Sequence, residues 1–208
     1  SSSIPLTAFT SHRGLYEFLR MPFGLTNAPA IFQRTMNKVM SGLIGKCCMA
    51  YLDDIVVYSK NEQEHAEHLT AVFDRLKEYG LQLKPSKCSI GMQEIELLGY
   101  HVSAKGIQPL TSKVDAILNL GPPTSVREVR SFLGMAGYYR QCVKGFATLS
   151  LPLVALTKKN APFIWGPAEQ ESFDQLKLAL VSDSVLAHPQ PDKPYHLYTD
   201  ASQYAVGA

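Results

Sequence analysis

Two adjacent aspartates, Asp53 and Asp54, stand between two apolar runs in residues 47–58. Such runs read as strands, and a pair of acids among them is costly without a cation or a hydrogen-bond network, because like charges raise each other's pKa. Because neighbouring residues of a flat strand point to opposite faces, both carboxylates reach one site only at a tight turn. The sequence therefore predicts a β-hairpin with Asp53 and Asp54 at its tip.

The carboxylates of this pair are hard oxygen ligands, which suit Mg²⁺ because that ion takes few carboxylates and keeps water or phosphate ligands. Two such ions about 3.5–4 Å apart stabilise the attacking and leaving oxygens of phosphoryl transfer. A plainer interpretation is an exposed Asp-Asp turn between edge strands, because turns favour Asp for reasons unrelated to catalysis. The pair alone does not decide between these interpretations.

The first 110 residues otherwise alternate between strand-like segments and amphipathic helices. Asn27 is expected to cap one helix, with Pro29 in its first turn, and Gly80 is expected to stop another. Gly99 falls inside a strand-like segment. The expected elements are a hairpin over residues 6–19 with its turn at 11–14, helices over 27–43 and 61–79, and extended pieces over 81–88 and 94–102.

From Thr111 onward the pattern becomes helical. Ser125 and Glu128 form a capping-box pattern, which marks a helix start. A short helix is expected over residues 146–156, and another carries Phe173 and its apolar neighbours. The last expected element is a strand over residues 195–200, which alternates and ends on an acid.

Charge and cysteine content narrow the classes of protein. The net charge is +2, but residues 111–165 hold seven Lys/Arg against two Asp/Glu, which fits a polyanionic partner or a solvated set of helices. No apolar run of 18 residues or signal peptide occurs, so we expect an intracellular protein or an internal piece of one. Four cysteines without a C-x-x-C pair predict reduced, mostly buried thiols.

Six segments taken in order carry a resemblance to a known family. They resemble the second polymerase motif, the metal-binding Tyr-x-Asp-Asp motif, the motif after it, the primer grip, the thumb and the opening of the RNase H domain in gypsy-type long-terminal-repeat retrotransposon reverse transcriptases. The segments are residues 19–33 (LRMPFGLTNAPAIFQ), 51–54 (YLDD), 83–88 (LKPSKC), 97–102 (LLGYHV), 132–140 (FLGMAGYYR) and 198–202 (YTDAS).

The resemblance implies roles at the polymerase site. Asp53 would be the principal Mg²⁺ ligand, and Asp54 the more peripheral second acid. Lys87 would neutralise or protonate the departing pyrophosphate, although Cys88 stands where some relatives carry a second lysine. Phe23 and Gly24 would line the nucleotide pocket, and Gln33 would contact the template or support that pocket. The plainer alternatives are a core position for Phe23, a solvated helix position for Gln33 and an ordinary surface lysine at position 87.

The resemblance also implies contacts with nucleic acid. Gly99 and Tyr100 would hold the primer 3′ end, while Tyr100 packed as an ordinary strand residue is the alternative. Asp200 would be the first of several carboxylates that hold Mg²⁺ for RNA-strand cleavage. His65 and His68 lie three residues apart beside glutamates, and a solvated helix face is favoured there over a metal site. Four cations would contact duplex phosphates, and the alternative is that they lie on the solvent-exposed face of a helix bundle. They are Arg127, Arg130, Arg140 and Lys144.

The implied fold is α+β, with an antiparallel polymerase palm that carries helices on one face, a helical thumb and the first strand of an RNase H-like domain. The implied domains are palm with part of the fingers over 1–110, thumb over 111–165, connection over 166–193 and the start of RNase H over 194–208. The implied activity is RNA-directed DNA polymerisation, with RNase H in the parent polyprotein.

The implied partners are an RNA template, a DNA primer, the RNA–DNA hybrid, deoxynucleoside triphosphates and the rest of the Pol polyprotein, with no membrane. The implied cofactor is a pair of Mg²⁺ ions, with Mn²⁺ as an alternative. We expect an intracellular location, either in cytoplasmic virus-like particles or in the nucleus.

The family's polymerase site uses another aspartate upstream of the segment that matches residues 7–9. We expect this chain to begin after that aspartate and to stop early in RNase H, so that it is an inactive fragment. A second hypothesis is a non-catalytic nucleic-acid-binding remnant of a decayed or co-opted element. A third, an unrelated Mg²⁺ enzyme with an Asp-Asp hairpin, leaves the other five matches unexplained.

Overall fold

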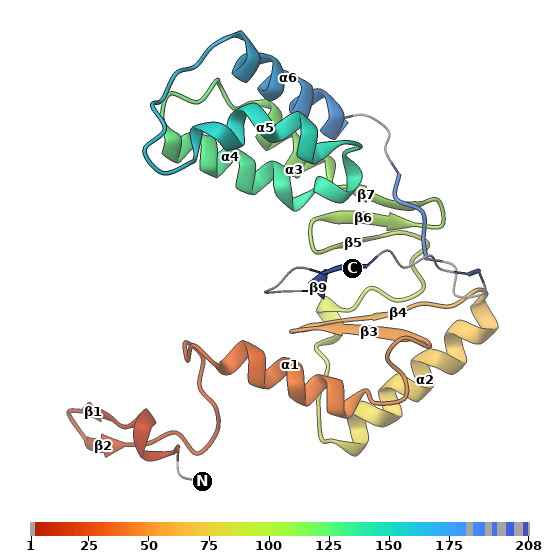
Figure 1. Cartoon of the computed structure of the whole chain (residues 1–208). Helices are drawn as coiled ribbons and strands as arrows, with labels where there is room; N and C mark the ends of the chain where they lie inside the picture. The colour runs from red at the N-terminus through yellow and green to blue at the C-terminus, as the bar shows by residue number, and fades with distance from the viewer. Residues whose placement is uncertain (1–2, 182–184, 190–192, 195–198, 202–205, 208) are drawn as a thin grey trace. The chain divides into compact units, whose positions relative to one another are not determined.

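A computed structural model describes residues 3–181, 185–189, 193–194, 199–201 and 206–207 (Figure 1). The chain divides into two compact units, Ser1–Gly91 and Met92–Ala208. Helices and small antiparallel sheets follow one another along the chain, and each sheet is built from strands adjacent in sequence. The α+β class is therefore confirmed.

A short hairpin opens the first unit. Strand β1 (Phe9–Ser11) pairs with β2 (Gly14–Tyr16), and Ser11 lies opposite Gly14. The hairpin is shorter than the sequence predicted, because Pro5–Thr7 form a 3-10 helix, η1. Proline at the start of that turn fixes φ near the helical value, which favours the turn over an extended strand.

Two helices flank the predicted hairpin in the first unit, α1 (Ala28–Val39) and α2 (Glu62–Glu78). The Asn61 side chain caps α2 by accepting a 2.9 Å hydrogen bond from the backbone N–H of Glu64. Asn27 stands at the start of α1 but makes no such bond, because its backbone is already helical there. The capping role predicted for Asn27 was therefore wrong, whereas the helix itself is confirmed.

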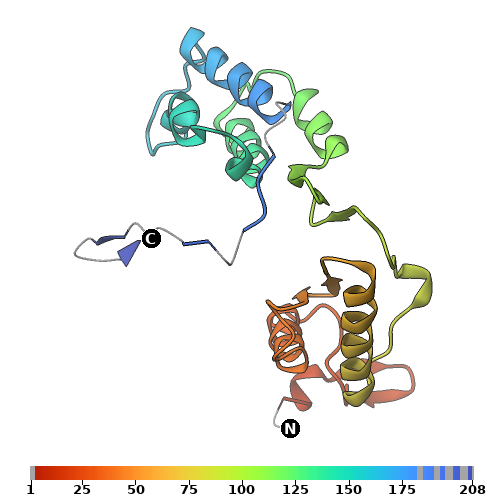
Figure 2. The same ribbon diagram turned by 90° about the vertical axis from the view of Figure 1, so that its right-hand side faces the viewer.

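The predicted aspartate hairpin is confirmed as β3 (Cys48–Tyr51) and β4 (Asp54–Val57). Helix α1 contacts β3 and α2 contacts β4, so both helices lie on one side of the hairpin (Figures 1 and 2). Arg75 of α2 donates hydrogen bonds of 2.8 Å to the carbonyls of Val39 and Ser41, which joins the two helices. The buried core between them consists of Met36, Val39, Met40, Cys48, Val72 and Leu76.

The second unit begins with a three-stranded antiparallel sheet of β5 (Ile95–Leu97), β6 (Tyr100–Ser103) and β7 (Gly106–Pro109). Leu98 and Gly99 form the loop between β5 and β6, and both have positive φ, 48° and 78°. Positive φ at both loop residues matches the type I′ hairpin turn. The prediction that Gly99 lies inside a strand was therefore wrong.

Upstream of this sheet, the prediction of an extended segment over residues 81–88 was also partly wrong. Pro85–Lys87 form a short 3-10 helix, η2. A proline in the first turn again favours the helical turn over the extended form.

Helices α3 (Thr111–Leu118), α4 (Val126–Tyr138), α5 (Phe146–Leu156) and α6 (Pro167–Val181) follow the sheet, with a 3-10 turn η3 (Arg140–Cys142) after α4. The predicted cap is confirmed, because Ser125 accepts from the Glu128 N–H. Phe132 and Phe173 meet at the centre of the bundle, with ring centroids 4.6 Å apart. The fully buried side chains at this centre also include Val129, Leu153 and Leu176.

A later segment of the chain returns to the edge of the sheet at β7. The backbones of Ile107 and Leu186 exchange two hydrogen bonds of 2.9 Å. Gly106 lies beside this bridge, and a Cβ placed there would stand 2.3 Å from the carbonyl oxygen of Leu186. Only glycine leaves room for the bridge. Two short strands, β8 (Asp200–Ala201) and β9 (Val206–Gly207), pair further on.

The cysteines are all free, and Cys47, Cys48 and Cys142 are buried while Cys88 is exposed. Burial, with the neighbouring Cys47 thiol adding to it, raises the pKa of Cys48 to about 11. That thiol therefore stays protonated at neutral pH, as expected for a structural cysteine. No helix of the described residues is long and apolar enough to cross a membrane.

Candidate active site

The aspartates lie at the tip of the β3–β4 hairpin. Tyr51 and Asp54 are the last paired residues, so Leu52 and Asp53 form a two-residue loop. Both aspartates are exposed. Cys48 and Ala50 face the helices, so by strand alternation Tyr51 and Asp54 lie on the opposite, open face. The loop places Asp53 at the tip itself, directly before Asp54.

One side chain from α1 holds this loop. Gln33 accepts a 2.5 Å hydrogen bond from the backbone N–H of Leu52 and donates one of 2.9 Å to the carbonyl of Ala50. Its amide also donates to Asn37, at 2.9 Å. The family resemblance implied that Gln33 contacts the template or supports the nucleotide pocket. The sequence gave no sign of the two bonds to the hairpin, because their partners lie 17 and 19 residues further along the chain.

The donor set at the tip fits a hard divalent cation. Two exposed carboxylates supply the oxygen ligands that Mg²⁺ takes from a protein when phosphates and water complete its shell. No cluster of three or more His, Cys, Asp or Glu side chains suited to a metal occurs among the described residues. The tip as described supplies two carboxylates, so any ion held there would take its other ligands from water or a phosphate.

Phe23 and Gly24 form a turn before α1. The Phe23 side chain is fully exposed, at 104% of its reference area, so the alternative of a core position was wrong. Gly24 has φ of +89°, and no atom lies within 4 Å of a Cβ placed on it. This turn therefore presents an aromatic ring and an open stretch of backbone to solvent, which suits contact with a ligand.

Lys87 ends η2 and is exposed. In the part of the chain that is described, no ion pair or hydrogen bond joins its ammonium group to Asp53 or Asp54. Among the described residues, Lys87 is thus an exposed cation that is not held against either aspartate.

The turn of Leu98 and Gly99 is held by tyrosine hydroxyls from the end of α4, and Tyr100 adds a bond of its own. Tyr139 donates to the carbonyl of Gly99 at 3.1 Å, and Tyr138 donates to the carbonyl of Leu98 at 2.5 Å. Tyr100 donates in return to the carbonyl of Tyr138, at 2.8 Å. Burial, with the nearby Cys142 and Tyr138 adding to it, raises the pKa of Tyr100 to about 12, so this hydroxyl remains a donor at neutral pH.

The four cations expected on phosphates are all exposed: Arg127, Arg130, Arg140 and Lys144. Arg130 differs from the others, because its guanidinium donates a 2.9 Å hydrogen bond to the carbonyl of Thr157 at the end of α5. It therefore has a structural partner within the bundle. Asp200 starts β8, and the strand expected over residues 195–200 lies mostly outside the described residues.

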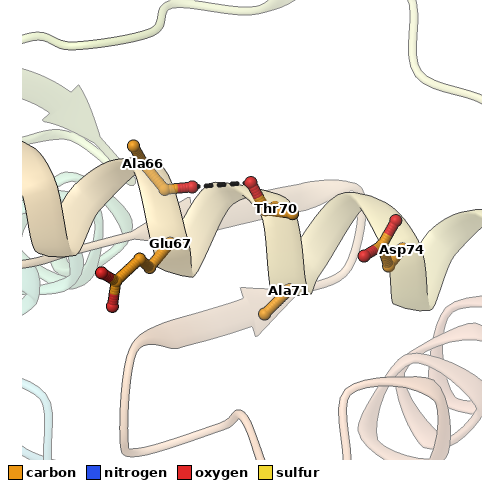
Figure 3. A pocket seen from close by; sticks show the side chains of 5 residues that line it. All are labelled: Ala66, Glu67, Thr70, Ala71 and Asp74. Atoms are coloured by element: carbon orange, nitrogen blue, oxygen red, sulfur yellow. Dashed lines mark hydrogen bonds between the residues drawn. The ribbon is translucent and has the colours of Figure 1, made fainter.

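A shallow hollow of the first unit lies elsewhere, along α2, where Ala66, Glu67, Thr70, Ala71 and Asp74 line it (Figure 3). None of the predicted site residues contributes to it. Near the start of α2, His65 and His68 are half-buried, and both rings contact the Ser59 hydroxyl, at 3.2 and 2.7 Å. These histidines are therefore structural partners of Ser59 rather than part of a purely solvated face.

Two family models match the chain. Residues 2–102 match "Reverse transcriptase (RNA-dependent DNA polymerase)", and residues 165–208 match "RNase H-like domain found in reverse transcriptase". The described hairpin therefore falls inside the polymerase match, and β8 and β9 fall inside the RNase H-like match.

Curated relatives match over nearly the whole chain. The retrovirus-related Pol polyprotein from transposon opus of Drosophila melanogaster is 42% identical over 100% of this chain, and that from transposon 297 is 41% identical over 99%. The Tf2-3 polyprotein of Schizosaccharomyces pombe is 36% identical over 97%. The chain spans 22%, 20% and 15% of these relatives' lengths.

Solved structures agree with the sequence matches. A foamy viral protease–reverse transcriptase in complex with double-stranded DNA has a TM-score of 0.82 and 26% identity, covering 97% of this chain and 36% of its own. The same kind of protein in complex with an RNA/DNA hybrid has a TM-score of 0.73 and 26% identity over 90% of this chain and 26% of its own. The resemblance read from the six motifs is confirmed, and the chain belongs to the reverse transcriptase family of retrotransposon Pol polyproteins.

Proposed function

We propose that this chain contributes to template-directed synthesis of DNA on an RNA template, as part of a longer retrotransposon Pol polyprotein. The observation that carries the proposal is the β3–β4 tip, where Asp53 occupies the loop and Asp54 lies opposite Tyr51 with both carboxylates exposed. In a chain of the reverse transcriptase family, an exposed acid pair on a rigid hairpin suits phosphoryl transfer better than an ordinary surface turn.

The proposed substrates are a deoxynucleoside triphosphate and a primer 3′-hydroxyl, whose oxygen attacks the α-phosphate while pyrophosphate leaves. Asp53 and Asp54 would hold Mg²⁺, as two ions with Mn²⁺ as the alternative. Bound Mg²⁺ would supply stabilisation of the charge that develops on the attacking and leaving oxygens. The chain's own residues would supply mainly positioning, which provides much of the rate in this class of reaction.

The other site residues are proposed to contact the nucleotide, the primer and the duplex. The Phe23 ring and the open backbone at Gly24 are proposed to pack on the incoming nucleotide, and Lys87 to neutralise or protonate the pyrophosphate. The Leu98-Gly99 turn, fixed by Tyr138 and Tyr139, is proposed to hold the primer end. The exposed Arg127, Arg140 and Lys144 would contact duplex phosphates, which gives affinity without reading sequence.

The partners proposed are RNA template, DNA primer and their hybrid. The foamy viral relatives in complex with double-stranded DNA and RNA/DNA hybrid support this choice. Asp200 is proposed to act in RNA-strand cleavage by the RNase H domain of the parent protein. The proposed location is intracellular, either in cytoplasmic virus-like particles or in the nucleus. We also propose that the palm ends at residue 110, the thumb at residue 165 and the connection at residue 193.

The test is primer extension on an RNA template with Mg²⁺, by this chain and by a longer chain extended upstream. We expect extension by the longer chain, its loss in Asp53→Asn, and unchanged duplex binding by that variant, because the substitution removes a metal ligand and no phosphate contact. Asp74→Asn, an exposed acid of α2, is the matched control and should leave extension intact. Duplex binding without extension by either chain would favour the non-catalytic remnant.

A further inference from the structure

The loop that carries Asp53 has an unusual backbone. Leu52 has φ of +49°, and it is the first of the two loop residues between the paired Tyr51 and Asp54. Positive φ at the first loop residue alone matches a type II′ turn, in which glycine normally stands. A leucine there is strained, and such strain persists only where surrounding contacts determine the conformation.

Gln33 supplies contacts on both sides of this residue. Its Oε1 accepts from the Leu52 N–H at 2.5 Å, and its Nε2 donates to the Ala50 carbonyl at 2.9 Å. Nε2 also donates to the Asn37 Oδ1, at 2.9 Å. Both amide hydrogens and the amide oxygen are thus engaged within the protein, which leaves little of the side chain to read a template or nucleotide.

The helix that carries Gln33 is itself firmly seated. Met36 and Val39, on the same helix, are 3% and 2% exposed in the core beneath the hairpin. Movement of Gln33 away from the loop would therefore disturb buried packing. The contacts form a chain from the core, through α1 and Gln33, to Leu52 and so to the next residue, Asp53.

We propose that Gln33 is a positioning residue that holds Leu52 in its left-handed conformation and thereby fixes the direction of the Asp53 carboxylate. This inference rests on the proposed function, because the orientation of Asp53 matters only if that carboxylate binds the reacting groups. It assigns Gln33 a role different from the nucleotide or template contact expected from its motif.

The experiment compares kcat and KM of primer extension by the longer chain described above with those of its variants. Gln33→Met keeps the size of the side chain but loses both hairpin bonds, and should lower kcat by about 10²-fold, the loss that small misplacements cause. The KM for nucleotide and the Kd for primer–template should stay unchanged. Gln33→Glu keeps the acceptor for the Leu52 N–H and should retain more activity than Gln33→Met.

The decisive variant is the double substitution Gln33→Met with Leu52→Gly. Glycine adopts positive φ without help, so it should restore most of the lost kcat. Asn37→Ala is the matched control, because it leaves both hairpin bonds in place and should keep wild-type kcat. A raised KM or Kd in Gln33→Met, or no rescue by Leu52→Gly, would overturn the proposal and return Gln33 to a ligand contact.

Hydrogen exchange of the Leu52 amide separates this inference from the proposed function. If the unsubstituted longer chain extends no primer, the proposed function fails. The proposal that Gln33 holds Leu52 can still be tested. Gln33→Met should then speed exchange of the Leu52 N–H while the midpoint of thermal unfolding stays near that of the parent. Unchanged protection of this amide would overturn the proposal that Gln33 holds Leu52, whatever the activity.

Discussion

The Tyr100 hydroxyl donates a 2.8 Å hydrogen bond to the backbone carbonyl of Tyr138, and the two rings stack with centroids 5.6 Å apart. The contact joins β6 to the end of α4. Tyr139 adds an edge-on ring 5.3 Å from Tyr100 and a bond to Gly99. Sheet and helix bundle are thus tied together within the second unit at the turn proposed to hold the primer.

Replacing Tyr100 with Phe should reduce the stability of this unit and change its pH dependence. Loss of one such hydrogen bond costs about 1 kcal/mol. The raised pKa of Tyr100, about 12 against an ordinary 10, means that this residue's contribution is fully present below pH 10. It is lost as pH rises through the folded value, because the unfolded chain releases the proton first.

Urea unfolding, followed at several pH values across that window, checks this prediction. Wild type should lose stability with rising pH more steeply than Tyr100→Phe. Tyr79→Phe, at a residue that is 46% exposed, is the control and should follow wild type. If the free energy of unfolding changes with pH in the same way for wild type and Tyr100→Phe, the Tyr100 hydroxyl does not stabilise the contact between sheet and helix bundle.

Gly106→Ala should break the bridge between β7 and the segment around Leu186. The new methyl group would stand 2.3 Å from the Leu186 carbonyl oxygen, which is closer than real contacts allow. We therefore expect the amides of Ile107 and Leu186, which bond each other's carbonyls at 2.9 Å, to lose protection from hydrogen exchange.

Gly14→Ala is the matched control for the backbone strain. Gly14 has φ of +127°, close to the +135° of Gly106, but nothing lies within 4 Å of its added methyl group. It should strain its own turn and leave the Ile107 and Leu186 amides protected. Full protection of those two amides in Gly106→Ala would mean that the bridge tolerates a side chain.

Local patterns in the sequence predicted much of this structure. The apolar runs around Asp53 and Asp54 predicted the hairpin, and the Ser125 capping-box pattern marked a helix start that the structure caps as expected. The helix predicted over residues 146–156 has those bounds. Each of these signals depends on residues only a few positions apart, which is the range over which turns, caps and helical periodicity act.

The contacts that the sequence did not predict join distant segments. Gln33 meets Leu52 only because α1 packs on β3, and Gly106 makes room for Leu186 only because a late segment returns to the sheet edge. The sequence predicts an extended piece that runs through Gly99, although a lone glycine in such a pattern also signals a turn or bulge. In the structure Gly99 belongs to a turn, and the hydroxyls of Tyr138 and Tyr139 donate to the carbonyls of its two residues.

Arg127 and Arg130 should affect duplex binding in different ways. Both are exposed on α4, but Arg130 donates to the Thr157 carbonyl, whereas Arg127 makes no side-chain hydrogen bond or ion pair within the described residues. Arg127→Ala should weaken duplex binding on all sequences and reduce the slope of log K against log salt by about 0.9, the effect of one phosphate contact on B-DNA.

Arg130→Ala should instead lower the stability of the helix bundle, because it leaves the Thr157 carbonyl without this partner, by roughly 1 kcal/mol. Salt titrations of duplex affinity and urea unfolding of the same two variants check both statements. Arg127→Ala should unfold like wild type. A slope change in Arg130→Ala equal to that in Arg127→Ala, with stability unaltered, would show that Arg130 leaves Thr157 to bind phosphate when the duplex is present.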